Sequence, residues 1–231
     1  MNDLHVVTKS TENPKVFDIY WMTGLVQKGR VRTTVTIQDD CRIAAELSTL
    51  QYLLETKNVC GHNKAGAGLR LWVSCGAIPK LLKQESEKFY LSPYANFLRT
   101  RFLGLKIDVE KRKVDWADEL CDRPVDEIRV VTPSMTVIEV AGVGPVELTA
   151  HAVGRYIERF DRPPAKAWRE LTRLAKEAIP LPVKRNEIHN LKHRNPGSFF
   201  ASKKVILVVA QPDHAGMLPR LVTVSTLRPT A

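Results

Sequence analysis

The chain has 231 residues, of which 44% are hydrophobic and 26% charged, and its formal net charge at pH 7 is +10. These fractions are ordinary for a globular protein, so they exclude a wholly disordered or low-complexity chain, and the length allows one large domain or two of ordinary size. The positive excess favours a polyanionic partner, most commonly RNA or DNA, whereas a merely basic protein is the alternative.

The first half of the sequence predicts a tail followed by a mixed α/β domain. Residues 1–14 are polar and end in Asn13-Pro14, so we expect an N-terminal tail there. Apolar residues recur at helical spacing over residues 42–56, and Asp40 is placed to cap that helix. The other expected elements of this half are strands over residues 16–21, 31–37, 69–73 and 106–114, and helices over 77–87 and 116–120.

The second half predicts a smaller α+β domain. Two helices, over residues 149–160 and 164–179, precede a small antiparallel sheet, and Thr149 is a good N-cap for the first. The expected strands cover residues 128–131, 136–140, 198–201, 205–210 and 220–226. We place the domain boundary near residues 124–126, which gives domains over 15–125 and 126–231.

The composition indicates a cytoplasmic protein with reduced cysteines. The four cysteines are scattered without Cys-x-x-Cys spacing, which argues against a disulfide framework. The N-terminal residues are polar, and no apolar run reaches the ~20 residues that a membrane-spanning helix needs. We therefore expect no membrane partner, whereas a protein partner and the oligomeric state stay open.

Acidic residues in the first half raise the possibility of a metal site. Asp18 interrupts the apolar strand 16–21, and Glu46 lies in the first turns of the helix 42–56. Two Mg²⁺ ions about 4 Å apart need shared carboxylate ligands, and a strand acid and a helix acid can meet at one sheet edge. Asp118 is a third candidate ligand, and a solvated surface position is the alternative for Glu46 and Asp118.

This first half resembles the RNase H-like superfamily over roughly residues 14–122. The helix carries Glu46-Leu47-x-x-Leu50-x-x-Leu53 after two hairpin strands, and residues 116–120 resemble a late Ala-Asp-x-Leu motif. The sequence departs from the family because Ser74 stands where the family has an aspartate, and Ile19-Tyr20 follow Asp18 in place of Gly-Ser. The resemblance therefore implies an RNase H-like mixed sheet with helices whose site is degenerate, with Mg²⁺ as cofactor only if that site is active.

In the second half, one helix face carries an imidazole and two guanidinium groups. His151, Arg155 and Arg159 are four residues apart, which places them along one face of the helix 149–160. An imidazole transfers protons near neutral pH, and arginine grips a phosphate with a bidentate fork, so this set suits RNA cleavage without a metal. The alternative is a capping histidine and arginines paired with Glu147 and Glu158.

Residues 147–228 resemble the barnase/EndoU/colicin/RelE-like group of ribonuclease toxins. The basis is the His-x-x-x-Arg-x-x-x-Arg helix together with two helices followed by a short sheet. Many members carry a polar residue on the last strand near the site. Here Thr223 and Ser225 alternate with valines and are the candidates for positioning a substrate.

Basic residues gather between the helices and the last strands. The candidate nucleic-acid contacts are Lys184, Arg185, Lys192, Arg194, Lys203 and Lys204. Phe199 and Phe200 lie among them, and interleaved basic and aromatic residues suit phosphate contact with base stacking. The alternative is a solvated basic loop over phenylalanines of the core. Residues 127–231 also carry a net charge of +7, against +3 for residues 1–126.

Three hypotheses of function follow. The first is a metal-independent ribonuclease in which His151 is the acid/base, Arg155 and Arg159 bind phosphate, and Thr223 or Ser225 positions the RNA. The second is a non-catalytic nucleic-acid- or protein-binding module of a phage or mobile element, with both active sites decayed. The third is a Mg²⁺-dependent RNase H-type nuclease that uses Asp18, Glu46 and Asp118.

Overall fold

The computed structural model describes residues 2–24, 27–61, 65–111, 114–121, 125–181, 197–212 and 214–226. The chain forms two compact units. The first comprises residues 1–98 and 102–134, and the second comprises residues 99–101 and 135–231. The change of unit near residue 134 lies after the boundary expected at 124–126, because the strand that begins at Val125 pairs with the first sheet.

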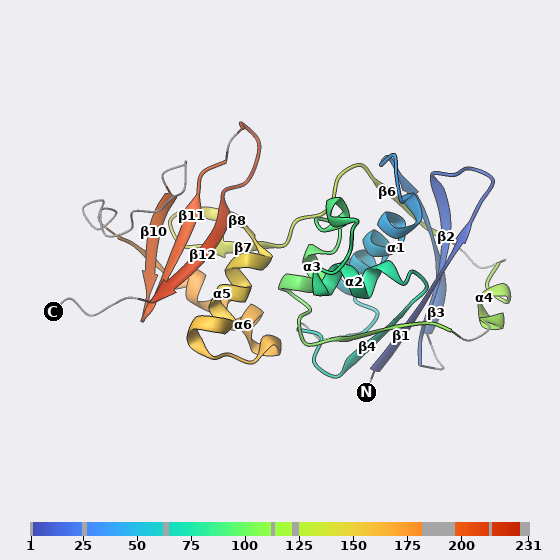
Figure 1. The fold of residues 1–231 in the computed structure, drawn as a ribbon, viewed down its shortest axis with the longest axis horizontal. Coiled ribbons are helices and arrows are strands. Elements are labelled where there is room, and N and C mark those ends of the chain that lie inside the picture. The colour runs from blue at the N-terminus through green and yellow to red at the C-terminus, as the bar shows by residue number, and fades with distance from the viewer. Residues whose placement is uncertain are drawn as a thin grey trace. The chain divides into compact units, whose positions relative to one another are not determined.

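A mixed six-stranded sheet organises the first unit, in the order β5-β4-β1-β2-β3-β6 (Figure 1). Its strands are β1 (Asn2–Ser10), β2 (Val16–Thr23), β3 (Gln27–Val35), β4 (Leu69–Val73), β5 (Lys106–Val109) and β6 (Val125–Val130). The first three strands form an antiparallel meander, whereas β4 pairs parallel to β1, β5 to β4 and β6 to β3. The mixed α/β class expected for the first half is confirmed.

The N-terminal residues form a central strand and not the expected tail. β1 lies between β2 and β4. Along it, Leu4, Val6 and Thr8 are buried, whereas His5 and Lys9 are partly exposed, so alternate side chains face opposite sides of the sheet. The tail prediction failed because polar residues on one face of this strand masked the apolar residues on the other.

Helices cover one face of this sheet. They are α1 (Cys41–Gln51), which continues as the π-helical turn η1 (Tyr52–Thr56), α2 (Ala77–Lys83), η2 (Phe89–Leu91) and α3 (Asn96–Thr100). Asp40 precedes α1 but does not cap it: its backbone is left-handed at φ 51°, and its carboxylate accepts hydrogen bonds from Lys88 and Tyr90. Asp40 therefore contributes no side-chain hydrogen bond to α1. The helix is held mainly by burial of its apolar side.

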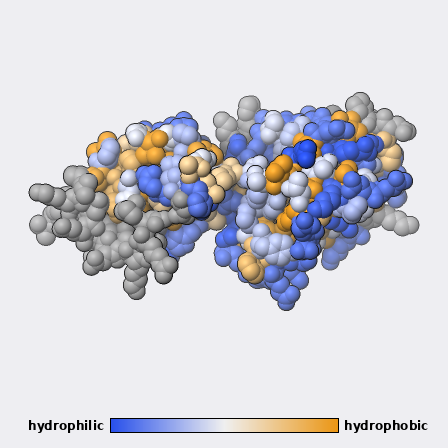
Figure 2. Space-filling model, turned by 90° about the horizontal axis from the view of Figure 1, so that it is seen from above, coloured by the Kyte–Doolittle hydropathy of each residue, from blue (hydrophilic) through white to orange (hydrophobic). Residues whose placement is uncertain are grey.

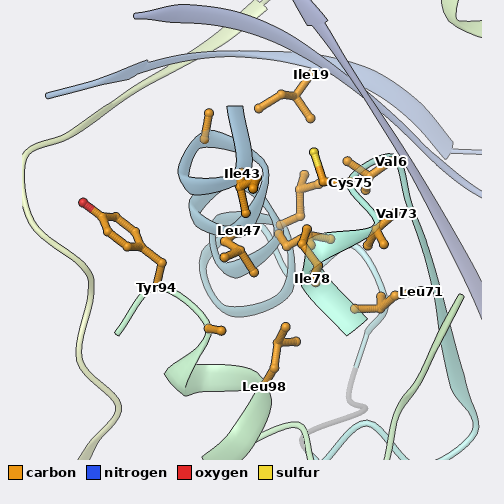
Figure 3. Close-up of a cluster of buried hydrophobic side chains, with 14 of the residues drawn as sticks. Val6, Ile19, Ile43, Leu47, Leu71, Val73, Cys75, Ile78, Tyr94 and Leu98 are labelled. Carbon is orange, nitrogen blue, oxygen red and sulfur yellow. The ribbon is translucent and has the colours of Figure 1, made fainter. Parts of the chain in front are cut away.

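The core of the first unit lies between α1 and the sheet. Figure 3 shows Ile43 and Leu47 of α1 among strand residues that include Val6, Leu71 and Val73. Leu47 and Leu71 are fully buried, and full burial of such a side chain stabilises the fold by roughly 1.5–3 kcal/mol. On the outside, hydrophilic residues cover most of the face of this unit that Figure 2 shows.

The short helix α4 (Asp115–Asp118) lies on the other side of the first sheet (Figure 1). Ala117 and Leu120 form a small buried cluster with Tyr20 of β2. Tyr20 pairs with Val7 of β1, and residues 5, 7 and 9 of β1 face away from the core around α1. Elements beyond β5 therefore reach the sheet face that α1 does not cover.

The second unit is also a mixed sheet with helices, in the strand order β7-β8-β12-β11-β10-β9. The strands are β7 (Val137–Val140), β8 (Gly144–Leu148), β9 (Ile179–Pro180), β10 (Gly197–Ser202), β11 (Val205–Ala210) and β12 (Arg220–Thr226). The sheet is not purely antiparallel as expected, because β8 pairs parallel to β12. The helices that link these two strands form the crossover that such a pair requires.

The helices of the second unit are α5 (Ala150–Phe160) and α6 (Pro164–Lys176). The N-cap is confirmed, since the Thr149 hydroxyl accepts a hydrogen bond from the backbone N–H of Ala152 at 3.1 Å. The same hydroxyl donates to the backbone carbonyl of Leu221 at 2.8 Å and so ties α5 to β12. In the ranges that the structure describes, no helix is long and apolar enough to cross a membrane.

Candidate functional site

The carboxylate of Glu46 is the centre of a buried hydrogen-bond network in the first unit. Glu46 is fully buried, and one oxygen accepts from the Thr8 hydroxyl at 2.6 Å and from the Ser74 hydroxyl. The other oxygen accepts from the backbone N–H groups of Ser74 at 2.7 Å and Cys75 at 3.3 Å. We call Thr8, Glu46, Ser74 and Cys75 the Glu46 centre.

The parallel pairing of β1 and β4 creates this centre. Thr8 follows the paired part of β1, Ser74 follows β4, and the Thr8 backbone N–H also donates to the Ser74 hydroxyl at 3.2 Å. Helix α1 brings Glu46 against both. Burial, and then the negative charge of Glu46, raises the pKa of Cys75 to about 12, so its thiol stays neutral.

The geometry of the Glu46 centre is that of a satisfied structural carboxylate. A carboxylate has about four lone-pair positions, and four protein donors occupy them here. Beside it stand two hydroxyl groups and a neutral thiol, which are not the bridging acids that a pair of Mg²⁺ ions needs. The centre therefore stabilises the fold around β1, β4 and α1.

Asp18 does not share a site with Glu46, because its side chain faces the opposite side of the sheet. It belongs to β2 and pairs in register with Lys9, which alternates with the inward-facing Thr8. Its carboxylate accepts two bonds from Arg32, from Nε at 2.9 Å and Nη2 at 3.0 Å, and Arg30 lies 3.7 Å away. The expectation that Asp18 and Glu46 lie together is wrong, because alternation along β2 turns the Asp18 side chain to the sheet face opposite α1.

Asp118 also lies on the side of the sheet away from Glu46. Its side chain on α4 is 72% exposed and accepts a hydrogen bond from Lys9. The three carboxylates expected to share metal ions are thus divided between two sheet faces. In the parts of the chain that the structure describes, no group of three or more His, Cys, Asp or Glu side chains is arranged to hold a metal ion.

Basic side chains on the outer sheet face of the first unit contact carboxylates. The Arg70 guanidinium lies 4.2 Å from the Trp72 ring centroid and bonds to Asp108 at 2.6 Å. The His5 ring of β1 stacks on the Trp72 ring of β4, with 5.6 Å between the ring centroids. The Nδ1 atom of His5 lies 2.9 Å from a Glu110 carboxylate oxygen.

In the second unit, the predicted helix face is present but its members do not converge. His151 is exposed near the start of α5. Arg155 pairs with Glu158 at 2.8 Å, as the alternative interpretation expected, and Arg159 donates to the backbone carbonyl of Val224. Two of the three predicted groups are thus engaged with the protein itself.

Thr223 and Ser225 lie on the sheet face away from α5. In register, Thr223 pairs with Val208 and Ser225 with Ile206, and these two partners form a buried cluster with Phe199. The alternate residue Thr226 instead lines a pocket with Tyr156 and Phe160 of α5. Strand alternation therefore separates the two hydroxyl residues from His151, and the structure does not bring the predicted catalytic set together.

Of the basic residues singled out in the sequence, two are described by the structure. Lys203 and Lys204 form the exposed turn between β10 and β11, and Lys203 has a left-handed backbone at φ 55°. Lys184, Arg185, Lys192 and Arg194 lie outside the described residues.

The two lysines belong to a pocket of about 550 Å³ that the sequence did not reveal. Its apolar part consists of Tyr156, Phe160, Leu174 and Val205, and its edge carries Arg162, Arg173, Lys203 and Lys204, with Glu170 and Thr226 completing the lining. We call this the basic pocket. The tyrosine and phenylalanine rings lie 5.2 Å apart at 32°, which fixes the aromatic surface.

Among the described residues that line the basic pocket, the one carboxylate, that of Glu170, is already engaged. Glu170 accepts a hydrogen bond from the Tyr156 hydroxyl at 2.8 Å and lies 3.4 Å from Arg162 Nε. Burial, and then the bond to Glu170, raises the pKa of Tyr156 to about 12, so its phenol keeps its proton at neutral pH. Within the described part of the chain, no carboxylate pairs with Arg173, Lys203 or Lys204.

The described lining of the basic pocket comes from separate parts of the sequence: α5 and the residues that follow it, α6, the β10–β11 turn with the start of β11, and the end of β12. The sequence interpretation named Lys203 and Lys204 but missed Phe160, Arg162 and Arg173. The available signal was the strong segregation of apolar and charged residues along both helices. That pattern predicts that each helix covers a core, but it does not reveal which charged edges meet.

Comparisons with known proteins give little that bears on function. No protein-family model and no curated protein matches the chain. A crystal structure of LC11-RNase H1 in complex with an RNA/DNA hybrid aligns with 52% of this chain and 93% of its own, at 16% identity and a TM-score of 0.40.

Proposed function

We propose that this protein binds nucleic acid through its second unit and that its first unit is a non-catalytic, RNase H-like scaffold. The observation that carries the proposal is the basic pocket, which exposed cations and an aromatic surface line together. Basic side chains neutralise phosphates and aromatic rings stack on bases, which is the combination that nucleic-acid-binding grooves use. The net charge of +7 over residues 127–231 supports the same partner.

The Glu46 centre supports the non-catalytic part of the proposal. Glu46 keeps the position of a helix-borne acid, but protein donors occupy its oxygens and hydroxyl groups flank it. Recruiting this carboxylate to Mg²⁺ would break several buried hydrogen bonds, each of which is costly to leave unmade. Scaffold stabilisation is therefore the role that the geometry favours for Glu46.

A second candidate function is metal-independent RNA cleavage by His151 with Arg155 and Arg159. The observation in its favour is the exposure of His151 one helical turn before Arg155. Against it stand the pairing of Arg155 with Glu158 and the position of Thr223 and Ser225 on the other sheet face. Cleavage would require Arg155 to leave Glu158, which a solvent-exposed pair permits at little cost.

Binding and cleavage are separated by incubating the full chain with labelled RNA and DNA over a range of salt, with Mg²⁺ or with EDTA. We expect a complex that weakens as salt rises, with a slope near −2 if about three phosphates of a single strand are contacted, and no shortening of the strand. Absence of salt-dependent binding would refute the proposal.

Product formation would decide between the other hypotheses. Cleavage that survives EDTA and is lost in His151→Ala would establish the second candidate. Cleavage that needs Mg²⁺ and is lost in Glu46→Gln would establish the RNase H-type site in place of the scaffold.

A further inference from the structure

We infer that the basic pocket receives one unpaired base of a single-stranded nucleic acid, so that the protein prefers single strands to duplexes. This inference rests on the proposed function, since it specifies which form of nucleic acid the same pocket takes. Three features of the pocket carry it: its aromatic surface, the placement of its cations and its size.

The aromatic surface of the pocket fits the face of a base. Phe160 is partly exposed, whereas Tyr156 is 3% exposed and packs against it. Phe160 is thus the ring that a ligand can reach, and Tyr156 holds it in place through the bond to Glu170. A base inside a duplex is stacked on both faces, so only an unpaired base can lie against Phe160.

Basic side chains line the same pocket as this aromatic surface. Lys203 and Lys204 reach it from the β10–β11 turn, and Arg173 reaches it from α6. All three are exposed, and the described residues offer them no carboxylate partner. A strand whose base occupies the pocket places phosphates on both sides of that base, where these cations can contact them.

The size and charge of the pocket match one nucleotide. Its volume of about 550 Å³ lies within the roughly 300–1,000 Å³ of sites for small ligands. It holds four basic side chains against the single carboxylate of Glu170, which Arg162 already neutralises. A neutral apolar ligand would leave that charge unmatched, whereas a nucleotide with its phosphates satisfies it.

The test compares affinities for a labelled single strand, as RNA and as DNA of one sequence, and for the matching duplex. We expect the full chain to bind either single strand roughly 10-fold more tightly than the duplex, because one stacked base changes affinity by about that factor. Phe160→Ala removes the preference by weakening single-strand binding alone. A difference in affinity between the RNA single strand and the DNA single strand would reveal additional contacts to the 2′-hydroxyl.

Two further variants separate stacking from packing. Phe160→Leu keeps an apolar side chain but no flat ring, so it should lose the preference while remaining folded by thermal unfolding. Phe160→Trp should restore or increase it. Lys166→Ala combined with Lys176→Ala, on α6 but outside the pocket lining, is the charge control and should leave the preference unchanged.

The outcomes distinguish this inference from the proposed function. Salt-dependent binding with equal affinity for duplex and single strand, or with no change in Phe160→Leu, overturns the inference and leaves nucleic-acid binding standing. A free nucleoside monophosphate that binds as tightly as the strand overturns it in favour of a small-molecule site. No binding of any nucleic acid refutes the proposed function itself.

Discussion

The Glu46 centre and the basic pocket each include one carboxylate among their described residues, but their charges are engaged to different extents. In the centre, four protein donors engage the Glu46 carboxylate. In the pocket, Tyr156 and Arg162 engage the only carboxylate, and three cations stay exposed. Charge that is satisfied internally stabilises a fold, whereas charge left at a concave surface serves recognition.

The largest expected effect is on stability, in the first unit. Glu46→Ala should lower the free energy of unfolding by about 3–5 kcal/mol, since it leaves several buried donors without an acceptor. Urea unfolding measures this loss, with the exposed Glu85→Ala as the matched control. If Glu46→Ala proved as stable as that control, the centre would not be a structural network.

The second effect should fall on both binding and stability, in opposite directions. Lys203→Gly relieves a left-handed lysine and should raise the free energy of unfolding by up to about 1 kcal/mol. The same change removes a phosphate contact and should weaken single-strand binding several-fold at low salt. If Lys203→Gly matched the wild type in stability and in affinity, the lysine turn would have no part in binding by the pocket.

Alkaline pH should destabilise the second unit through Tyr156. Its pKa is raised to about 12 in the folded protein, against 10.0 for an ordinary tyrosine. The stability that this shift contributes is therefore present below pH 10 and lost as the pH rises towards 12. Tyr156→Phe has no proton to lose, so its free energy of unfolding should fall less over that window than in the wild type. Ionisation of Tyr156 near pH 10 in a spectrophotometric titration would contradict this.

The smallest expected effect concerns Mg²⁺ and the Glu46 centre. Because protein donors already occupy Glu46, millimolar Mg²⁺ should leave the thermal midpoint of the protein unchanged relative to EDTA. Ca²⁺ at the same concentration controls for general ionic effects. A rise of several degrees that Glu46→Gln abolishes would show that the carboxylate exchanges its hydrogen bonds for a metal ion.

Local patterns in the sequence predicted much of the second unit correctly. Strands β11 and β12 begin and end where the runs of valine, isoleucine and threonine do, and α5 begins after its threonine cap. The two-unit organisation and the α/β class followed from the same patterns. These features depend on neighbours in sequence, so the sequence alone determines them well.

The candidate sites depended on contacts that local patterns do not contain. Because β1 was not predicted, the strand of Asp18 was counted as the first strand, and Asp18 was expected beside Glu46. In the structure this strand is β2, which turns Asp18 to the sheet face away from Glu46. Thr8, the true strand neighbour of Glu46, lay in the presumed tail. The basic pocket was missed because Phe160, Arg173 and Lys203 meet only after α5, α6 and the sheet have packed.

We propose that the exposed cations of the basic pocket, and not the Glu46 centre, bind nucleic acid. The most direct test is to measure how single-strand affinity depends on salt for the wild type and for Lys203→Ala combined with Lys204→Ala. We expect the double variant to bind more weakly at low salt, with a slope of log affinity against log salt that is shallower by about 1.4, for two lost phosphate contacts. An unchanged slope and affinity in this double variant, with the protein folded, would contradict it.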